Sequence, residues 1–258
     1  MSELDLSAYR ITFSDDFEAD LLDENVWSTR YWWGGRTLTS NGELQYFADG
    51  DTLLLASHPD RTPFSVSGGV LTITARPTPD PTLTEGLPYV SGMISSFASF
   101  SQKFGYFEMR AKVPEGRGLW PAFWLLPADG SWPPEIDVME MLCNDSSTFY
   151  GSLHLGSPDN HLRETKAIIA DLDLSRDFHC YGLLWNADRI DWYLDRHLMC
   201  SHPNLAGGLN CPMYLLAGLM VGGAWGGRPD TSTRFPANFH IDYVRAYASV
   251  TPAPREGN

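Results

Sequence analysis

Short runs of β-branched and aromatic residues recur along this chain between glycine, proline, asparagine and aspartate, a pattern typical of β-strands separated by turns. In residues 70–74, Leu71 and Ile73 alternate with Thr72 and Thr74, so one face of the segment is apolar. Long apolar stripes with helical spacing are hard to find, and we expect little helix. The expected strands span residues 10–18, 69–77, 105–113, 122–127, 149–156, 189–197, 213–221 and 239–247.

The number of predicted strands favours two stacked sheets. A lone sheet would leave one apolar face in water, so many antiparallel strands in a chain of 258 residues must close into a barrel or stack as a sandwich. We predict an all-β sandwich of two antiparallel sheets. Residues 1–250 are expected to form a single domain, with loops at 80–89, 157–166 and 204–212 and a linker-like tail at 251–258.

Composition and charge narrow the range of partners. The chain is 43% hydrophobic and 19% charged, which is enough apolar surface for a globular core. Its net charge of -14 disfavours nucleic acid and anionic membranes as partners, and a neutral partner fits better. No uninterrupted run of about 18 apolar residues is present, and the first residues lack the features of a signal peptide. We expect secretion to depend on a signal outside this sequence.

Four cysteines contribute little to the functional prediction. They form no C-x-x-C pair and show no histidine spacing of the kind found in zinc sites, so a structural zinc ion is not expected. Cys200 and Cys211 are close enough in sequence for a disulfide across a short loop, but no pattern requires the bond. The remaining two are Cys143 and Cys180.

Three acids lie within six residues of an otherwise apolar segment, WPPEIDVMEML (residues 132–142). In an extended strand, Glu135 and Asp137 point to the same face, whereas Glu140 would point to the other. One bulged residue around Val138 and Met139 would return Glu140 to the face of the first two acids. The spacing therefore predicts a bulged strand with three carboxyl groups on one side.

Paired carboxyl groups of this kind suit a retaining glycosidase. That reaction needs a nucleophile and a proton donor about 5 to 5.5 Å apart, and glutamates about four strand steps apart can approach this separation. Because Asp137 lies between the two glutamates, the three acids resist ionising together and should keep one proton. We expect that proton on Glu140, the acid, while a hydrogen bond keeps Glu135 ionised. The plainer alternatives are a solvent-facing polar edge or a calcium-binding cluster.

The surrounding motifs resemble those of glycoside hydrolase family 16, whose laminarinase-like members carry E-I-D-x-x-E on a bulged strand. The resemblance extends over nearly the whole chain and rests, besides residues 135–140, on segments at 15–18 (DDFE), 41–47 (NGELQYF), 105–127, 189–195, 221–227 and 241–247. It implies a β-jelly-roll with a concave substrate cleft, in which Glu135 is the nucleophile, Asp137 its helper and Glu140 the acid/base.

The family resemblance also implies a substrate class and a set of cleft residues. Members cut internal bonds of β-linked polysaccharides with retention and need no cofactor for catalysis, which makes β-1,3- or β-1,3-1,4-glucan the expected partner of a monomeric enzyme. Many members hold one structural calcium ion, which implicates Asp242 here. The expected substrate-binding residues are Asn41, Glu43, Trp120, Trp124, His154 and Trp225.

Three positions depart from the laminarinase pattern. Met93 stands where many members have an arginine, and Gly218 and Ala224 stand where asparagine is common. The lost polar contacts make a bacterial exopolysaccharide an alternative substrate. Two other classes stay open: a non-catalytic carbohydrate-binding jelly roll, and an interaction module organised by calcium.

Overall fold

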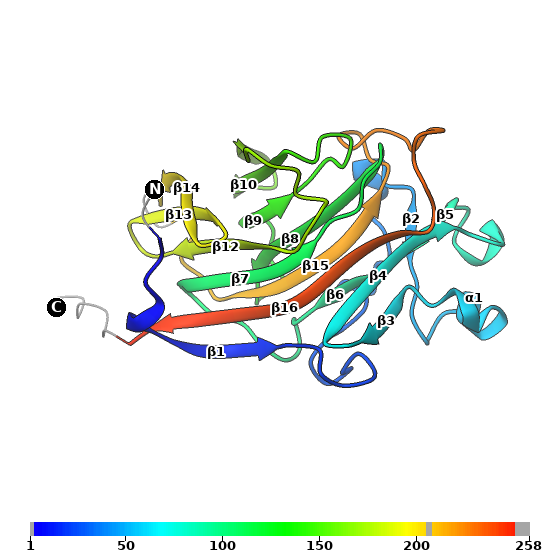
Figure 1. Ribbon diagram of the computed structural model, residues 1–258, viewed down its shortest axis with the longest axis horizontal. Coiled ribbons are helices and arrows are strands. Elements are labelled where there is room, and N and C mark those ends of the chain that lie inside the picture. Colours follow the sequence, from blue (N-terminus) through cyan, green and yellow to red (C-terminus); the bar gives the residue numbers. More distant parts are fainter. Residues whose placement is uncertain (1–2, 205–207, 251–258) are drawn as a thin grey trace.

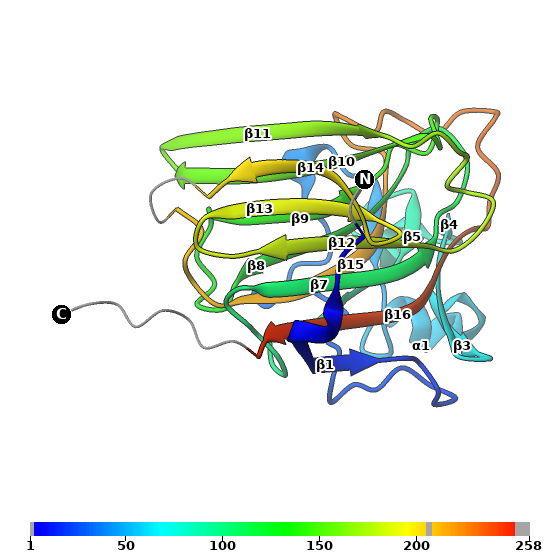
Figure 2. The same ribbon diagram turned by 60° about the vertical axis from the view of Figure 1, so that its left-hand side comes forward.

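The computed structural model describes residues 3–204 and 208–250, whose strands form two sheets (Figures 1 and 2). The six-stranded sheet has the order β11 (Asn160–Ile169), β10 (Thr148–Ser157), β9 (Glu135–Glu140), β8 (Leu119–Pro127), β15 (Met213–Val221) and β6 (Met93–Ser95). The ten-stranded sheet has the order β14 (His197–Pro203), β13 (Arg189–Leu194), β12 (His179–Trp185), β7 (Gly105–Lys112), β16 (Ala237–Ser249), β4 (Val70–Pro77), β5 (Tyr89–Ser91) and β2 (Gln45–Phe47).

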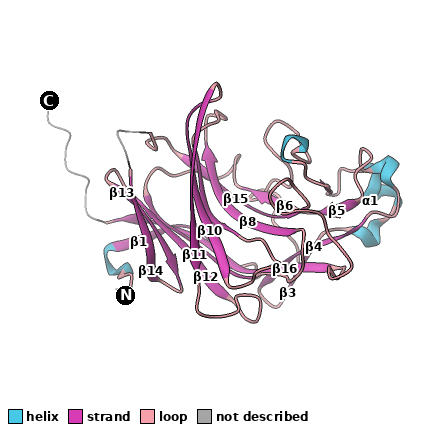
Figure 3. Ribbon diagram, turned by 90° about the horizontal axis from the view of Figure 1, so that it is seen from above, coloured by secondary structure: helices cyan, strands magenta, loops and turns pink. Residues whose placement is uncertain are grey.

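Two further strands and a few helical turns complete the described fold. Strand β1 (Tyr9–Asp15) pairs with β16, and β3 (Phe64–Ser67) pairs with β4. The pairing of β2 with β5 is parallel, and the other strand pairings are antiparallel. Helix α1 (Leu53–Ser57) lies at one end of the molecule in Figure 3, and the remaining helical turns are η1 (Leu6–Ala8), η2 (Thr39–Asn41), η3 (Pro59–Arg61) and η4 (Pro81–Leu83). The prediction of two sheets with little helix is confirmed.

The main core lies between the sheets and is built by side-chain alternation. Along β8, Leu119, Phe123 and Leu125 belong to this core and are fully buried. The intervening residues of β8 point to the opposite face and line a cleft. Both faces of β8 are therefore covered, one by the other sheet and one by cleft residues. This explains why its sequence is continuously apolar and does not alternate.

One predicted loop is wrong. Residues 157–166 were expected to be irregular, but most of them belong to β11, which pairs with β10 over its whole length. Strand β11 forms the edge of the six-stranded sheet, and nine of its ten residues are exposed. A polar edge strand has no alternating apolar face, so the hydrophobic pattern gives no sign of it.

Other predictions meet the structure only in part. All four cysteines are free thiols, so Cys200 and Cys211 are not paired. The predicted domain ends at residue 250, one residue after β16 ends, and the tail at 251–258 lies outside the described residues. Among the residues that the structure describes, no helix is long and apolar enough to cross a membrane.

Candidate active site

Strand β9 contains the predicted bulge. On the neighbouring β10, Ser152 pairs with Asp137 and Tyr150 pairs with Glu140, so two residue steps on β10 face three on β9. The pairing with β8 shifts at the same place. The two intervening residues of β9 are both fully buried in the main core (Val138 and Met139). The extra residue thereby returns Glu140 to the face that carries Glu135 and Asp137.

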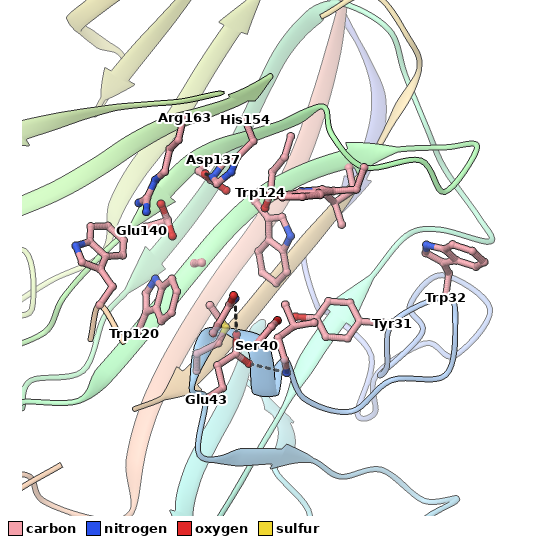
Figure 4. A pocket seen from close by; sticks show the side chains of 18 of the residues that line it. Tyr31, Trp32, Ser40, Glu43, Trp120, Trp124, Asp137, Glu140, His154 and Arg163 are labelled. Carbon is pink, nitrogen blue, oxygen red and sulfur yellow. Dashed lines mark hydrogen bonds and ion pairs between the residues drawn. The ribbon is translucent and has the colours of Figure 1, made fainter. Parts of the chain in front are cut away.

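This acidic face forms part of a cleft of about 510 Å³ on the outer side of the six-stranded sheet. Figure 4 shows Asp137, Glu140 and His154 close together, with tryptophan rings beside them. The cleft brings together the nine residues predicted for catalysis and substrate binding: Asn41, Glu43, Trp120, Trp124, Glu135, Asp137, Glu140, His154 and Trp225. Their individual roles stay predictions, but their placement in one cleft is what those roles require.

Each acid of β9 has a polar neighbour of its own. Trp132 Nε1 donates a hydrogen bond to Glu135 Oε2 (2.7 Å), His154 Nε2 lies 3.2 Å from Asp137 Oδ2, and Ser152 Oγ donates to Glu140 Oε2 (3.1 Å). The partners come from β10 and from the loop that precedes β9. The three carboxyl groups are therefore oriented by neighbouring segments as well as by their own strand.

Burial raises the pKa of all three carboxyl groups, because a charge is costly where water is excluded. The pKa of Glu135 rises to about 8, with the negative charge of Asp137 as the second cause, and that of Asp137 rises to about 7. The pKa of Glu140 rises well above its ordinary value, first through burial and then through repulsion by the other two acids. Arg163 acts in the opposite direction on Asp137 and Glu140.

These shifts support Glu140 as the group that holds a proton at neutral pH, as predicted. The expectation for Glu135 needs correction, because burial outweighs the hydrogen bond from Trp132 that favours its ionised form. The trio titrates as a coupled unit, so protonation of one member makes ionisation of the next less costly.

We expect replacement of Glu135 with Gln to stabilise the protein in a pH-dependent way. Between pH 4.5 and about 8, the folded protein keeps a proton on Glu135 that the unfolded chain releases, so the free energy of unfolding falls as the pH rises. A neutral Gln has no proton to release on unfolding, so the variant does not lose this part of its free energy of unfolding. Calorimetry should show a melting temperature roughly 10 °C above wild type at pH 8, because one pKa unit corresponds to about 1.4 kcal/mol and each 1 kcal/mol shifts the melting temperature of a domain of this size by about 2–4 °C.

At pH 3.5 the melting temperatures of the Glu135→Gln variant and wild type should nearly coincide, because a full unit below the ordinary pKa of 4.5 the unfolded chain also keeps its proton on Glu135. The exposed Glu24→Gln variant is the control and should show no such pH-dependent gap. An equal gap at both pH values would show that packing, not ionisation, separates Glu135→Gln from wild type.

Aromatic rings form the wall of the cleft near Glu140. Trp225 meets Trp120 edge to face, with ring centroids 5.5 Å apart, and Tyr150 lies 4.8 Å from Trp225 on another side. The loop carrying Trp225 approaches closely because Gly223 has φ +90° and a Cβ atom there would lie 3.1 Å from the Trp120 ring. The Arg163 guanidinium lies over the Trp225 ring, with Cζ 4.9 Å from the ring centroid. Trp124 lines the same cleft, which settles its place on the cleft face of β8.

Glu43 is committed to internal bonds. Its carboxylate accepts hydrogen bonds from Gln45 Nε2 (2.6 Å), Asn41 Nδ2 (3.1 Å) and the Leu38 amide (3.2 Å), and it is 4% exposed. Burial raises its pKa, while these bonds act in the opposite direction. Glu43 therefore holds the turn that presents the exposed Asn41 to the cleft.

Several cleft residues were missed by sequence reasoning, among them Tyr31, Trp32, Trp33, Trp132, Arg163 and Tyr214. The aromatic cluster at 31–33 was a usable signal, since three adjacent rings in a glycine-flanked loop are costly unless they are covered or bind a partner. Arg163 was missed with β11, the strand that carries it.

Two departures from the laminarinase pattern compensate one another. Met93 and Gly218 pair across β6 and β15, and a Cβ atom at Gly218 would lie 3.0 Å from that of Met93. Met93 is fully buried and does not line the cleft, whereas Ala224 does. The loss of polar groups at 93 and 218 is thus a packing exchange beneath the cleft floor.

The predicted calcium ligand is engaged elsewhere. Asp242 Oδ2 forms an ion pair with Arg110 Nη1 at 2.6 Å. The described residues contain no group of three or more His, Cys, Asp and Glu side chains placed to hold a metal ion. The calcium site expected from the family resemblance needs only one acidic side chain, that of Asp242, beside oxygen ligands of other kinds, so calcium binding stays a prediction.

Paired acids beside tryptophan rings on an all-β sandwich are the arrangement typical of jelly-roll glycosidases. Residues 33–245 match the family described as Glycosyl hydrolases family 16, and the chain belongs to this family. The resemblance predicted from its motifs is confirmed.

Known proteins show the same relationship. The chain is 41% identical over 254 residues to endo-1,3-1,4-beta-glycanase ExsH of Rhizobium meliloti (strain 1021), covering 95% of this chain and 53% of ExsH. It therefore spans about half the length of this curated relative. The laminarinase structure from Rhodothermus marinus has a TM-score of 0.80 at 30% identity, covering 94% of this chain and 98% of that one. SCLam, a non-specific endo-beta-1,3(4)-glucanase, has a TM-score of 0.80 at 30% identity, covering 96% and 94%.

Proposed function

We propose that this chain is an endo-acting, retaining glycoside hydrolase that cleaves internal β-1,3 or mixed β-1,3-1,4 bonds of a glucan. The observation that carries the proposal is the bulge in β9, which places Glu135 and Glu140 on one face, within a cleft lined by tryptophans. The similarity to ExsH, an endo-1,3-1,4-beta-glycanase, and to SCLam, a non-specific endo-beta-1,3(4)-glucanase, supports β-1,3 and mixed β-1,3-1,4 linkages. An open cleft suits the interior of a chain, as endo cleavage requires.

The geometry supports a double displacement. The ionised form of Glu135, which becomes the major form only above its pKa of about 8, attacks the anomeric carbon while Glu140 gives its proton to the departing glycosidic oxygen, so a glycosyl ester forms and the sugar chain breaks. Glu140, now ionised, takes a proton from water as that water attacks the same carbon and frees Glu135. Two inversions give net retention. Asp137, which lies 3.2 Å from His154, raises the pKa of both glutamates and so opposes simultaneous ionisation.

Product analysis tests this function. The protein is incubated with laminarin, lichenan and a bacterial exopolysaccharide, and the products are followed by mass and by proton NMR. We expect a ladder of oligosaccharides from the first minutes and the β-anomer as the initial product. An initial α-anomer would contradict retention, and release of only small sugars from chain ends would contradict endo action.

A bacterial exopolysaccharide is the second candidate substrate. Arg163 supports it, because it is the one Lys or Arg among the described residues that line the cleft, and a cation there suits a substrate bearing acidic groups. A non-catalytic sugar-binding role would be supported only if no reducing ends arose from any polysaccharide. We further propose that the protein acts as a secreted monomer, which sedimentation and assay of the culture medium test.

A further inference from the structure

One end of the cleft holds aromatic rings that the proposed reaction does not use. Trp32 and Trp33 line the cleft but remain 46% and 48% exposed. The loop that runs into Glu135 passes this end, since a Cβ atom at Gly130 would lie 2.7 Å from the Trp32 ring. In Figure 4, Trp32 lies at the side of the cleft away from Glu140 and Trp120. These rings therefore extend the cleft on the Glu135 side.

The Trp32 ring is held in place although much of it is open to solvent. It stacks on Phe97, with ring centroids 5.6 Å apart and ring planes inclined by 18°. It meets Trp33 edge to face, with ring centroids 5.7 Å apart. Trp33 in turn stacks on the buried Tyr31, with ring centroids 4.5 Å apart and ring planes inclined by 7°. A flat apolar surface that is ordered before a ligand arrives binds that ligand with a smaller loss of side-chain entropy.

A second, independent feature adjoins this platform. Tyr214 is 1% exposed, lines the same cleft and packs edge to face on Phe97 at 5.1 Å. Its hydroxyl has no hydrogen-bond partner among the described residues. Burial and the nearby charge of Glu135 raise the pKa of Tyr214, so the group stays a neutral hydroxyl. A buried hydroxyl without a partner is costly, and a ligand hydroxyl would relieve the cost.

We propose that Trp32 and Tyr214 form a distal sugar-binding subsite on the Glu135 side of the cleavage point. The subsite takes two consecutive pyranose units of the polysaccharide. The outer unit lays its apolar C–H face on the Trp32 ring, and the inner unit meets the Tyr214 hydroxyl with one of its own. The inference rests on the proposed function, because it concerns the same cleft, and it specifies how a long chain is held there.

Binding to a non-cleaving variant tests the subsite apart from catalysis. Laminarihexaose and a mixed-linkage glucan hexasaccharide are titrated into Glu135→Gln protein by calorimetry, with and without Trp32→Ala. We expect Trp32→Ala to weaken hexasaccharide binding about fivefold to tenfold, and disaccharide binding much less. The control is Leu53→Ala, at an apolar residue of α1 that is 74% exposed outside the cleft and should change neither affinity. Equal affinities with and without Trp32 for both hexasaccharides would overturn the proposal.

Tyr214→Phe separates ligand recognition from a structural role. If the hydroxyl serves the sugar, this variant should lose several-fold in hexasaccharide affinity and be at least as stable as its parent, because an unpaired buried hydroxyl is removed. Lower stability with unchanged affinity would refute the Tyr214 contact. If wild type cleaves none of the polysaccharides but the hexasaccharides still bind through Trp32, the proposed function fails and the subsite stands.

Discussion

Replacing Glu135 with Ala is expected to lower kcat/KM on the polysaccharide by roughly 10⁴-fold or more, because no other described group on this face is placed to replace the nucleophile. Asp137 is two residues away and its side chain is one carbon shorter than that of Glu135, so it does not reach the position of the missing carboxylate. The assay follows new reducing ends with the purified variant. Circular dichroism verifies that the variant retains the fold.

Sodium azide identifies the role of Glu135. With an activated aryl β-oligosaccharide, azide can enter the space left by the carboxylate and attack the anomeric carbon once. A single inversion gives an α-glycosyl azide. Recovery of this product supports Glu135 as nucleophile. A β-glycosyl azide from Glu135→Ala would show that the assigned roles are reversed.

Replacing Glu140 with Ala should reduce polysaccharide turnover by about 10²- to 10⁴-fold, because the glycosidic oxygen would leave without a proton. The loss should nearly vanish for the first step of a 2,4-dinitrophenyl glycoside, whose leaving group needs no protonation. With no base to activate water, the ester on Glu135 should accumulate, and intact-protein mass spectrometry measures it.

Azide gives the complementary product in this variant. It attacks the ester in place of water, so a second inversion yields the β-glycosyl azide. Glu24→Gln, an exposed acid outside the cleft, is the matched control and should turn over like wild type. A Glu140→Ala variant that loses activity equally on every leaving group would exclude the role of general acid.

Strand prediction succeeded where one face of a strand is buried. The run at 213–221 coincides with β15, and the run at 69–77 differs from β4 by one residue. It failed for β11, which is stabilised by hydrogen bonds to β10 and carries a polar surface. Such a strand is defined by its neighbour, and no local pattern identifies it. The same failure concealed Arg163.

The catalytic face was predictable because its signal is local. Six consecutive residues contain both the acids and the spacing that demands a bulge, and the pairing of β9 with β10 bears this out. The direction of the Glu135 pKa was not predictable, since it depends on how far the surrounding segments exclude water. The use of Asp242 by Arg110 depends likewise on strands β7 and β16 lying side by side.

By itself the sequence determined the all-β class, the bulged acidic strand and membership of the family. Each of these depends on side-chain alternation or on motifs of a few adjacent residues. Only the tertiary structure decided which rings share the cleft with those acids. Trp32, Phe97 and Tyr214 are far apart along the chain, and their contacts exist only after the loops and β15 are brought together. Burial, pKa shifts and unpaired donors arise from that assembly, so they follow from the fold as a whole.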